Sequence, residues 1–187
     1  MEKLRYILTV LALLFVGALF GGSLYDTLVL APNLHGGPQG LEHGRLFMAA
    51  ATPANFFRTL APASQALVLA ALVLNWRSPQ VRWPLLIALA GLVTADIVTF
   101  TYHYPRNAIM FTAPTTVEPE RLGAVAREWQ AANYLRVFLV LTAWLGAVRA
   151  LTVIVQKRSR PPSNTRAALD AADEHQFTIR TSPAPRQ

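Results

Sequence analysis

The sequence predicts an all-α membrane protein, a bundle of four transmembrane helices with a short extra helix in the outer loops. Hydrophobic residues make up 53% of the chain and charged residues only 14%. The apolar residues are gathered into four long blocks. Such blocks are typical of helices that cross a bilayer rather than of a water-soluble core. The chain has no cysteine, which excludes disulfides, thiolate catalysis and thiolate metal sites.

The first predicted span covers about residues 6–30 and follows two basic residues, Lys3 and Arg5. Residues 6–24 carry no charge, and at 1.5 Å per residue they are long enough for a hydrocarbon core of about 30 Å. A signal peptide also begins with basic residues before an apolar stretch. Here the apolar stretch is longer and continues past Asp26 to Leu30, so we expect a retained helix.

The other predicted spans cover about residues 55–76, 83–104 and 133–156. Pro62 is expected in the first turns of the second span, where lost hydrogen bonds are easiest to tolerate. The third span contains a single charged residue, Asp96, and the fourth contains Arg136 and Arg149. A short helix is expected over 41–51, and an amphipathic helix is expected from Val117 into the fourth span, with acidic residues in its first turn.

The domain organisation follows from these blocks. Residues 1–156 form one predicted transmembrane domain, and residues 157–187 form a predicted disordered cytoplasmic tail. The tail contains Pro161-Pro162-Ser163-Asn164 and other Pro- and Ser-rich stretches. Such a composition buries too little apolar surface to fold.

Lysine and arginine residues beside the spans predict the orientation. One side of the membrane has nine of them and the other has six. The nine are Lys3, Arg5, Arg77, Arg82, Arg149, Lys157, Arg158, Arg160 and Arg166. We therefore expect a multi-pass protein of the plasma (inner) membrane with both termini in the cytoplasm and both long loops outside.

The expected partners are the lipid bilayer and a hydrophobic small molecule. The net charge of +7 does not indicate a nucleic-acid partner, because the excess lies at the chain ends and in one short turn. A basic stripe interleaved with aromatic residues, typical of nucleic-acid binding, is missing from the sequence. The sequence leaves a homo-oligomer open.

Polar residues at membrane depth are costly, so each is a candidate functional residue. They gather at the outer end of the predicted bundle. Asp96 and His103 are about two turns apart on one helix face, and Trp129, Asn133 and Arg136 share another face at i, i+4 and i+7. Two such stripes on adjacent helices predict a pocket open to the outer surface, with Asp96 as its floor.

Several of these residues also have a purely structural interpretation. Arg136 could neutralise Asp26 or Asp96 as an ion pair, since buried charges are generally paired. Trp129 and Tyr104 could belong to the aromatic belts at the membrane interface.

The same holds for four further residues. His103 could lie in the headgroup region, and Asn107 could be a turn residue. Gly17 and Gly21 form a small-xxx-small pair, which is typical of helix packing.

A metal centre is an alternative to a site without a cofactor. His35, His43 and His103 are all expected on the outer side, and imidazole binds copper, zinc or iron. The two loop histidines lack a ligand spacing such as His-x-x-x-His. We therefore expect no cofactor, with a metal held by these three histidines as the alternative.

Two short motifs follow the third span and enter the fourth. Residues 101–107 read TYHYPRN, and residues 129–136 read WQAANYLR. With the small-residue stretch at 17–25, they resemble the anthrone-oxygenase-like family of small four-span membrane proteins, long catalogued as a domain of unknown function. That family pairs a Pro-x-Asn after helix three with a Trp and a polar-x-x-Arg entering helix four. The resemblance covers about residues 6–155 and excludes the tail.

The resemblance implies a membrane oxygenase-like enzyme that acts on a hydrophobic, phenolic or anthrone-type substrate with molecular oxygen. In many family members the residue four positions after the Trp is a histidine, where this chain has Asn133. His103 or Asp96 would then be the base that forms the enolate. Arg136, Asn107 and Asn133 would stabilise the enolate oxygen. Trp129 and Tyr104 would stack on the ring, and Arg58 would be a further substrate-binding residue.

The alternative is a non-enzymatic membrane protein. It would be a helper subunit or a binder of a lipid or quinone, and the same outer pocket would then bind its ligand without turnover.

Overall fold

The computed structural model describes residues 1–34, 37–112 and 117–159. The chain divides into two compact units, Met1–Val153 and Ile154–Gln187. The described part of the second unit, residues 154–159, is helical. The helical structure therefore continues past the expected domain boundary at residue 156, and residues 160–187 of the expected tail lie outside the described residues.

All regular structure in the described part of the chain is helical, and three segments are π-helical turns. The elements are α1 (Glu2–Tyr25), the π turn η1 (Asp26–Leu30), α2 (Ala31–Asn33), α3 (Gly37–Phe47), α4 (Pro53–Leu74), α5 (Pro79–Val98), the π turn η2 (Thr99–His103), α6 (Tyr104–Asn107), the π turn η3 (Ala108–Thr112) and α7 (Pro119–Ser159).

Four helical runs in the described residues are long and apolar enough to cross a membrane. They are Glu2–Asn33, Pro53–Leu74, Pro79–Phe111 and Pro119–Ser159. With α3 as the short extra helix, this confirms the predicted fold class. It also indicates an integral, multi-pass membrane protein.

Three of the four runs extend well beyond the spans expected from the sequence. The 41 residues of α7 correspond to about 60 Å, roughly twice the thickness of a hydrocarbon core. The amphipathic helix expected from Val117 is the first part of this continuous helix, which begins at Pro119. Pro62 lies inside α4, which begins at Pro53.

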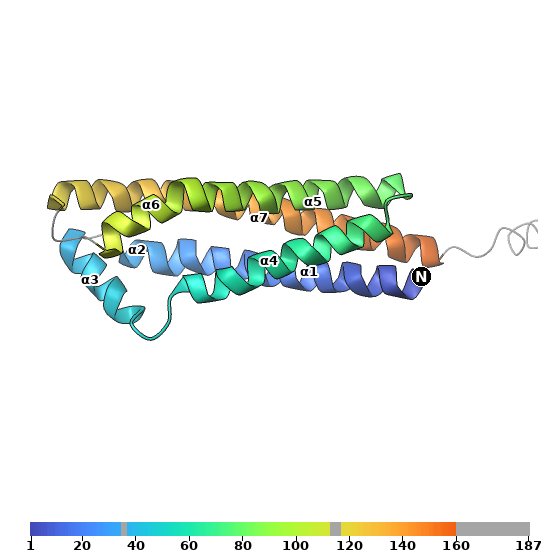
Figure 1. The fold of residues 1–187 in the computed structure, drawn as a ribbon, viewed down its shortest axis with the longest axis horizontal. Coiled ribbons are helices and arrows are strands. Elements are labelled where there is room, and N and C mark those ends of the chain that lie inside the picture. The colour runs from blue at the N-terminus through green and yellow to red at the C-terminus, as the bar shows by residue number, and fades with distance from the viewer. Residues whose placement is uncertain (35–36, 113–116, 160–187) are drawn as a thin grey trace, which may run out of the picture. The chain divides into compact units, whose positions relative to one another are not determined.

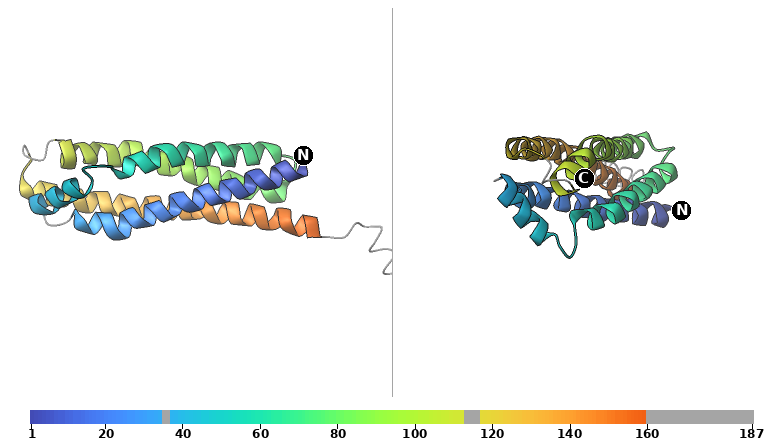
Figure 2. Two further views of the ribbon diagram at one scale, coloured as in Figure 1. Left: turned by 90° about the horizontal axis from the view of Figure 1, so that it is seen from below. Right: turned by 60° about the vertical axis from the view of Figure 1, so that its left-hand side comes forward.

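Within the first unit, α1 and α4 lie on one side of the bundle and α5 and α7 on the other (Figures 1 and 2). The helix α4 starts near α3, crosses obliquely, and meets α5 at the short turn that joins them (Figure 1). We refer below to the end of the bundle that carries α3 as the α3 end, and to the end with the α4–α5 turn as the turn end.

The buried face of α1 shows how the bundle is held together. Its buried residues recur at steps of three and four, namely Thr9, Ala12, Val16, Leu19 and Ser23. This spacing places them in one stripe along the helix. The hydroxyls of Thr9 and Ser23 donate to the carbonyls four residues earlier, at 2.8 and 2.9 Å. These polar groups are therefore satisfied within their own helix.

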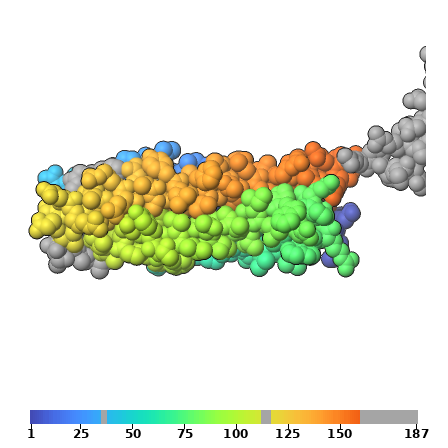
Figure 3. Space-filling view, turned by 90° about the horizontal axis from the view of Figure 1, so that it is seen from above, coloured from blue at the N-terminus to red at the C-terminus, as the bar shows by residue number. Residues whose placement is uncertain are grey.

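Helices α5 and α7 approach closely through glycine. A Cβ atom on Gly91 would lie 2.8 Å from the Leu139 carbonyl oxygen, and one on Gly146 would lie 2.6 Å from the Pro84 carbonyl oxygen. In the space-filling view these two helices lie against each other along the bundle (Figure 3). Small residues at the contact permit this packing, as in other membrane helix pairs.

A hydrophobic cluster lies at the α3 end. Its buried members are Ala31, Leu34, Leu41, Met110, Leu122, Val125, Ala126 and Trp129. They come from α2 and the residue after it, α3, η3 and the first part of α7. Through this cluster, α3 packs against the ends of the helical runs that project beyond the core of the bundle.

Candidate functional site

Two π turns place ionisable side chains inside the bundle. Asp26 is the first residue of η1, and His103 is the last residue of η2. A π turn contains an extra residue relative to an α-helix, and such turns are frequent at functional sites. Both side chains are buried, with exposed fractions of 3% for Asp26 and 1% for His103.

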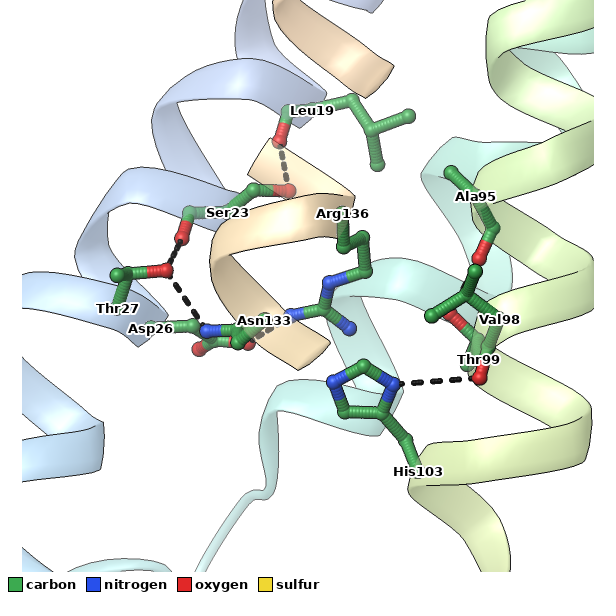
Figure 4. Close-up of polar contacts among 10 residues, drawn as sticks. All are labelled: Leu19, Ser23, Asp26, Thr27, Ala95, Val98, Thr99, His103, Asn133 and Arg136. Carbon is green, nitrogen blue, oxygen red and sulfur yellow. Dashed lines mark hydrogen bonds and ion pairs between the residues drawn. The ribbon is translucent and has the colours of Figure 1, made fainter. Parts of the chain in front are cut away.

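Asp26 forms a buried ion pair with Arg136. A guanidinium nitrogen of Arg136 donates to the Asp26 carboxylate at 2.9 Å (Figure 4). The Arg136 guanidinium carbon also lies 4.7 Å from the centre of the Phe57 ring, a cation–π contact. The structural pair expected for Arg136 is therefore present, and its partner is Asp26.

Asp96 has a different partner. Gln65 of α4 donates from its side-chain amide to the Asp96 carboxylate at 2.6 Å. Asp96 is half-buried, so this contact joins α4 to α5 next to the pocket described below. The sequence interpretation did not include Gln65, because an uncharged residue in a span gives a weaker signal than a charged one.

His103 points into the bundle and faces the Arg136 guanidinium (Figure 4). Its Nδ1 lies 3.4 Å from the Val98 carbonyl oxygen, at the long end of hydrogen-bond distances. Its ring meets the Trp129 ring edge-to-face, with centroids 5.3 Å apart. When Nδ1 carries the proton, Nε2 is the unprotonated nitrogen. Nε2 is buried and has no hydrogen-bond partner among the described residues.

These side chains line one cavity of about 750 Å³ at the α3 end of the bundle. All four long helices contribute to its wall. Of the residues singled out from the sequence, it is lined by Asp26, Arg58, Asp96, His103, Tyr104, Asn107, Trp129 and Arg136. Most of the remaining lining is apolar and includes Leu19, Leu30, Phe57, Leu92, Phe100 and Val140.

Asn133 does not line this cavity. Its amide nitrogen donates to the Thr27 hydroxyl at 2.7 Å, and Thr27 in turn donates to the Ser23 carbonyl at 2.9 Å (Figure 4). Asn133 is fully buried. In this structure it joins α7 to η1 outside the cavity lining.

Several lining residues retain unpaired polar atoms. Buried atoms without a hydrogen-bond partner in the described part of the chain include His103 Nε2, Asn107 Oδ1, Trp129 Nε1 and Arg136 Nε. All four residues line the cavity. A buried polar atom without a partner costs free energy, so a ligand with donors and acceptors would be stabilised here.

A second polar cluster lies close to the cavity. Glu128 accepts from Arg106 at 2.9 Å and from Arg121 at 3.2 Å. The Arg106 guanidinium carbon also lies 3.3 Å from the centre of the Tyr102 ring. This network ties the segment after η2 to α7 and so helps to hold His103 against Trp129.

No group of three or more His, Cys, Asp or Glu side chains that could hold a metal ion occurs in the described residues. His43 is exposed on α3, while His103 is buried in the cavity wall. His35, the third proposed ligand, lies outside the described residues.

Comparisons of the chain with protein-family models, with curated proteins and with solved structures give no match.

Proposed function

We propose that this protein is a membrane-embedded, oxygenase-like enzyme that acts on a hydrophobic, phenolic or anthrone-type substrate. The observation that carries the proposal is that His103 and Arg136 face each other in the wall of a largely apolar cavity. A base and a fixed positive charge are the two groups needed to form and stabilise an enolate. The short motifs around Asn107 and Trp129 that resemble the anthrone-oxygenase-like family agree with this chemistry.

The cavity fits a substrate of this class in size and lining. Its volume of about 750 Å³ lies within the range of ligand pockets, about 300–1,000 Å³. Phe57, Phe100 and Trp129 offer aromatic faces and edges to a ring system. Arg58, Tyr104 and Asn107 offer polar groups for its oxygen substituents.

The proposed reaction begins with proton abstraction by His103. His103 Nε2 has no hydrogen-bond partner among the described residues, so it is free to accept a proton from a substrate in the cavity. Nε2 then takes a proton from the activated carbon. The Arg136 charge stabilises the resulting enolate oxygen.

Dioxygen is the oxidant in this scheme. The enolate gives one electron to dioxygen, and the two radicals combine to form a C–O bond. The imidazolium returns its proton to the peroxide. Loss of the second C–H proton then breaks the O–O bond, which gives a carbonyl and water. An anthrone and one dioxygen thus become an anthraquinone and one water.

Oxygen uptake by the full-length protein in lipid vesicles tests this proposal, with a hydroxyanthrone as the substrate. We expect uptake above the spontaneous rate, lowered about 10²–10⁴-fold by His103→Gln, the range attributed to a general base. The matched control is His43→Gln, because His43 is an exposed histidine on α3 outside the cavity lining. Equal rates for the wild type and His103→Gln would exclude His103 as the base.

The second candidate is a non-enzymatic binder of a lipid or quinone, or a helper subunit with such a ligand. The contacts of Asn133 and Asp96 favour it, because both side chains are already hydrogen-bonded to other residues. A quinone that stays bound through purification, together with no oxygen uptake on any phenolic substrate, would favour the binder.

The orientation completes the proposal. The excess of lysine and arginine at the chain ends and in the α4–α5 turn supports cytoplasmic termini in the plasma (inner) membrane. The α3 end and its cavity then face outward. A homo-oligomer is compatible with this arrangement.

A further inference from the structure

The cavity wall includes residues that are also exposed on the outside of the bundle. Phe100 of η2 lines the cavity and is 59% exposed, and Pro62 of α4 lines it and is exposed as well. A residue with both properties lies at a rim. Four more lining residues are also exposed and extend the rim toward the α3 end, namely Arg45, Thr52, Arg58 and Tyr104. Phe100 and Pro62 belong to different helical runs, so their part of the rim lies between η2 and α4.

The course of α4 explains this opening. The helix meets α5 at the turn end and diverges from it toward the α3 end (Figure 1). Residues of both helices line the cavity there, among them Ala61 and Gln65 of α4 and Ala95 of α5. On the other side of α5, the contacts of Gly91 and Gly146 hold α7 close. In Figure 3 the side chains of α5 and α7 meet along this contact. The opening therefore belongs to the α4 side.

The depth of the rim in the membrane can be measured from the turn end. Trp76 and Trp83 are exposed there, and the Arg82 guanidinium carbon lies 5.3 and 5.4 Å from their rings. Exposed tryptophans beside arginine are typical of the membrane interface. From Trp83 to Phe100 the helix rises about 25 Å, within a hydrocarbon core of about 30 Å. Tyr104, about 32 Å from Trp83, lies near the opposite interface.

The cavity is chemically graded along the same direction. Its rim at Phe100 and Pro62 is apolar, whereas Arg45 and Arg58 line it nearer to α3. The buried Asp26–Arg136 pair lies on the inner wall. An amphiphile could place its polar atoms against Arg58 or Arg136 and its apolar part against Phe100.

We propose that the cavity opens sideways to the hydrocarbon core between α4 and η2, past Phe100 and Pro62, and that its ligand is an uncharged or weakly acidic amphiphile dissolved in the bilayer. This inference rests on the proposed function for the identity of that amphiphile. It adds that the substrate arrives from the lipid and not from water. Dioxygen, which dissolves better in hydrocarbon than in water, takes the same route.

Spin labels in single-cysteine variants test the route, since the native chain has no cysteine. Labels at Ala61→Cys and Thr99→Cys replace cavity-lining residues of α4 and η2. The full-length variants are placed in lipid vesicles, and their relaxation by lipid-soluble dioxygen is compared with relaxation by a water-soluble nickel chelate. The controls are Ala66→Cys, exposed on α4, and His43→Cys, exposed on α3.

The measured quantity is the ratio of label relaxation by dioxygen to label relaxation by the nickel chelate. We expect this ratio at positions 61 and 99 to match the ratio at position 66 and to exceed the ratio at position 43. A ratio like that at 43 would show that the cavity opens to water, and a label relaxed by neither reagent would show a closed cavity. Either result overturns the proposed route. If the label at 61 prevents folding, position 99 decides alone. Oxygen uptake by the unlabelled protein is measured separately, so the route can fail while the proposed enzyme activity stands.

Discussion

The Arg136–Asp26 pair places two opposite charges inside the apolar part of the bundle. Each charge alone would be costly at this depth, and their contact at 2.9 Å makes the arrangement tolerable. The pair also joins α7 to the π turn η1 and forms part of the cavity wall. It therefore has a structural role whether or not the cavity supports a reaction.

Arg136→Ala should destabilise the protein by about 3–5 kcal/mol, the cost of leaving one partner of a buried ion pair alone. The measurement is the free energy of unfolding of the purified protein in detergent. The matched control is Arg127→Ala on the same helix, since Arg127 is exposed and surface changes usually stay within about 0.5 kcal/mol.

The double variant Asp26→Asn, Arg136→Gln removes both charges and should recover part of the loss. If Arg136→Ala and Arg127→Ala unfold alike, the buried pair does not stabilise the bundle.

At this scale the sequence predicted which residues gather at one end of the bundle but left the partner of Arg136 open. Asp26 and Asp96 were equally good candidates by position. The structure pairs Asp96 with Gln65, which leaves Asp26 for Arg136. A single sequence does not contain this choice, because it depends on which helices are neighbours.

Asn133 shows a second limit of helical spacing. It shares a broad face with Trp129 and Arg136, yet at about 100° per residue it lies roughly 60° around the axis from Arg136. That offset turns its side chain to Thr27, while the other two side chains line the cavity.

At the scale of elements, the three π turns shape the site and were not predicted. Each adds a residue to its helical turn, so the phase of the side chains changes there. Hydropathy indicates the length of an apolar block and is insensitive to its phase, which is why the blocks were found and the turns were not. Two of the turns carry buried ionisable side chains. Asp26 lies in η1, which continues α1, and His103 lies in η2, which continues α5.

The contact of α5 with α7 leads to a prediction about glycine. Gly146→Ala should destabilise the protein by about 1–3 kcal/mol, the usual cost of overpacking, because the new Cβ would lie 2.6 Å from the Pro84 carbonyl oxygen. Thermal unfolding of the purified variant is the measurement.

Gly21→Ala is the matched control, since a Cβ there meets nothing within 4 Å in the described structure. Alanine is favoured over glycine inside a helix by about 0.5–1 kcal/mol, so this variant should be as stable as the wild type or slightly more. Equal destabilisation by both substitutions would contradict the close approach of α5 and α7.

For the whole molecule, the sequence predicted four long apolar helices and a short extra helix, and the structure confirms this. The length of each apolar block and its lack of charged residues are enough to predict a membrane-spanning helix, and helix packing need not be known. The arrangement of the helices depends on contacts between distant residues, such as Gly91 with Leu139. It could not be derived from a single sequence.

The orientation is a testable property of the whole chain. Reporter domains fused at the N-terminus, after Ser78 and at the C-terminus should be cytoplasmic, and one inserted after Ala50 should be outside, because the basic residues concentrate at the turn end. The activity of each reporter in intact cells is the measurement. If the C-terminal reporter is found outside the cell, the topology is the reverse of the one proposed, and the cavity lies on the cytoplasmic side.

The central claim is that His103 removes a proton from a hydrophobic substrate held in the cavity beside Arg136. Anaerobic spectroscopy tests it without the later oxygen steps, because the enolate of a hydroxyanthrone absorbs at longer wavelength than the neutral ketone. Vesicles containing the wild-type protein should develop the enolate band and lose it to anthraquinone when air is admitted, while His103→Gln should show neither change. An enolate band of equal strength in both proteins, or its absence from wild-type protein that still binds the hydroxyanthrone, would contradict the claim.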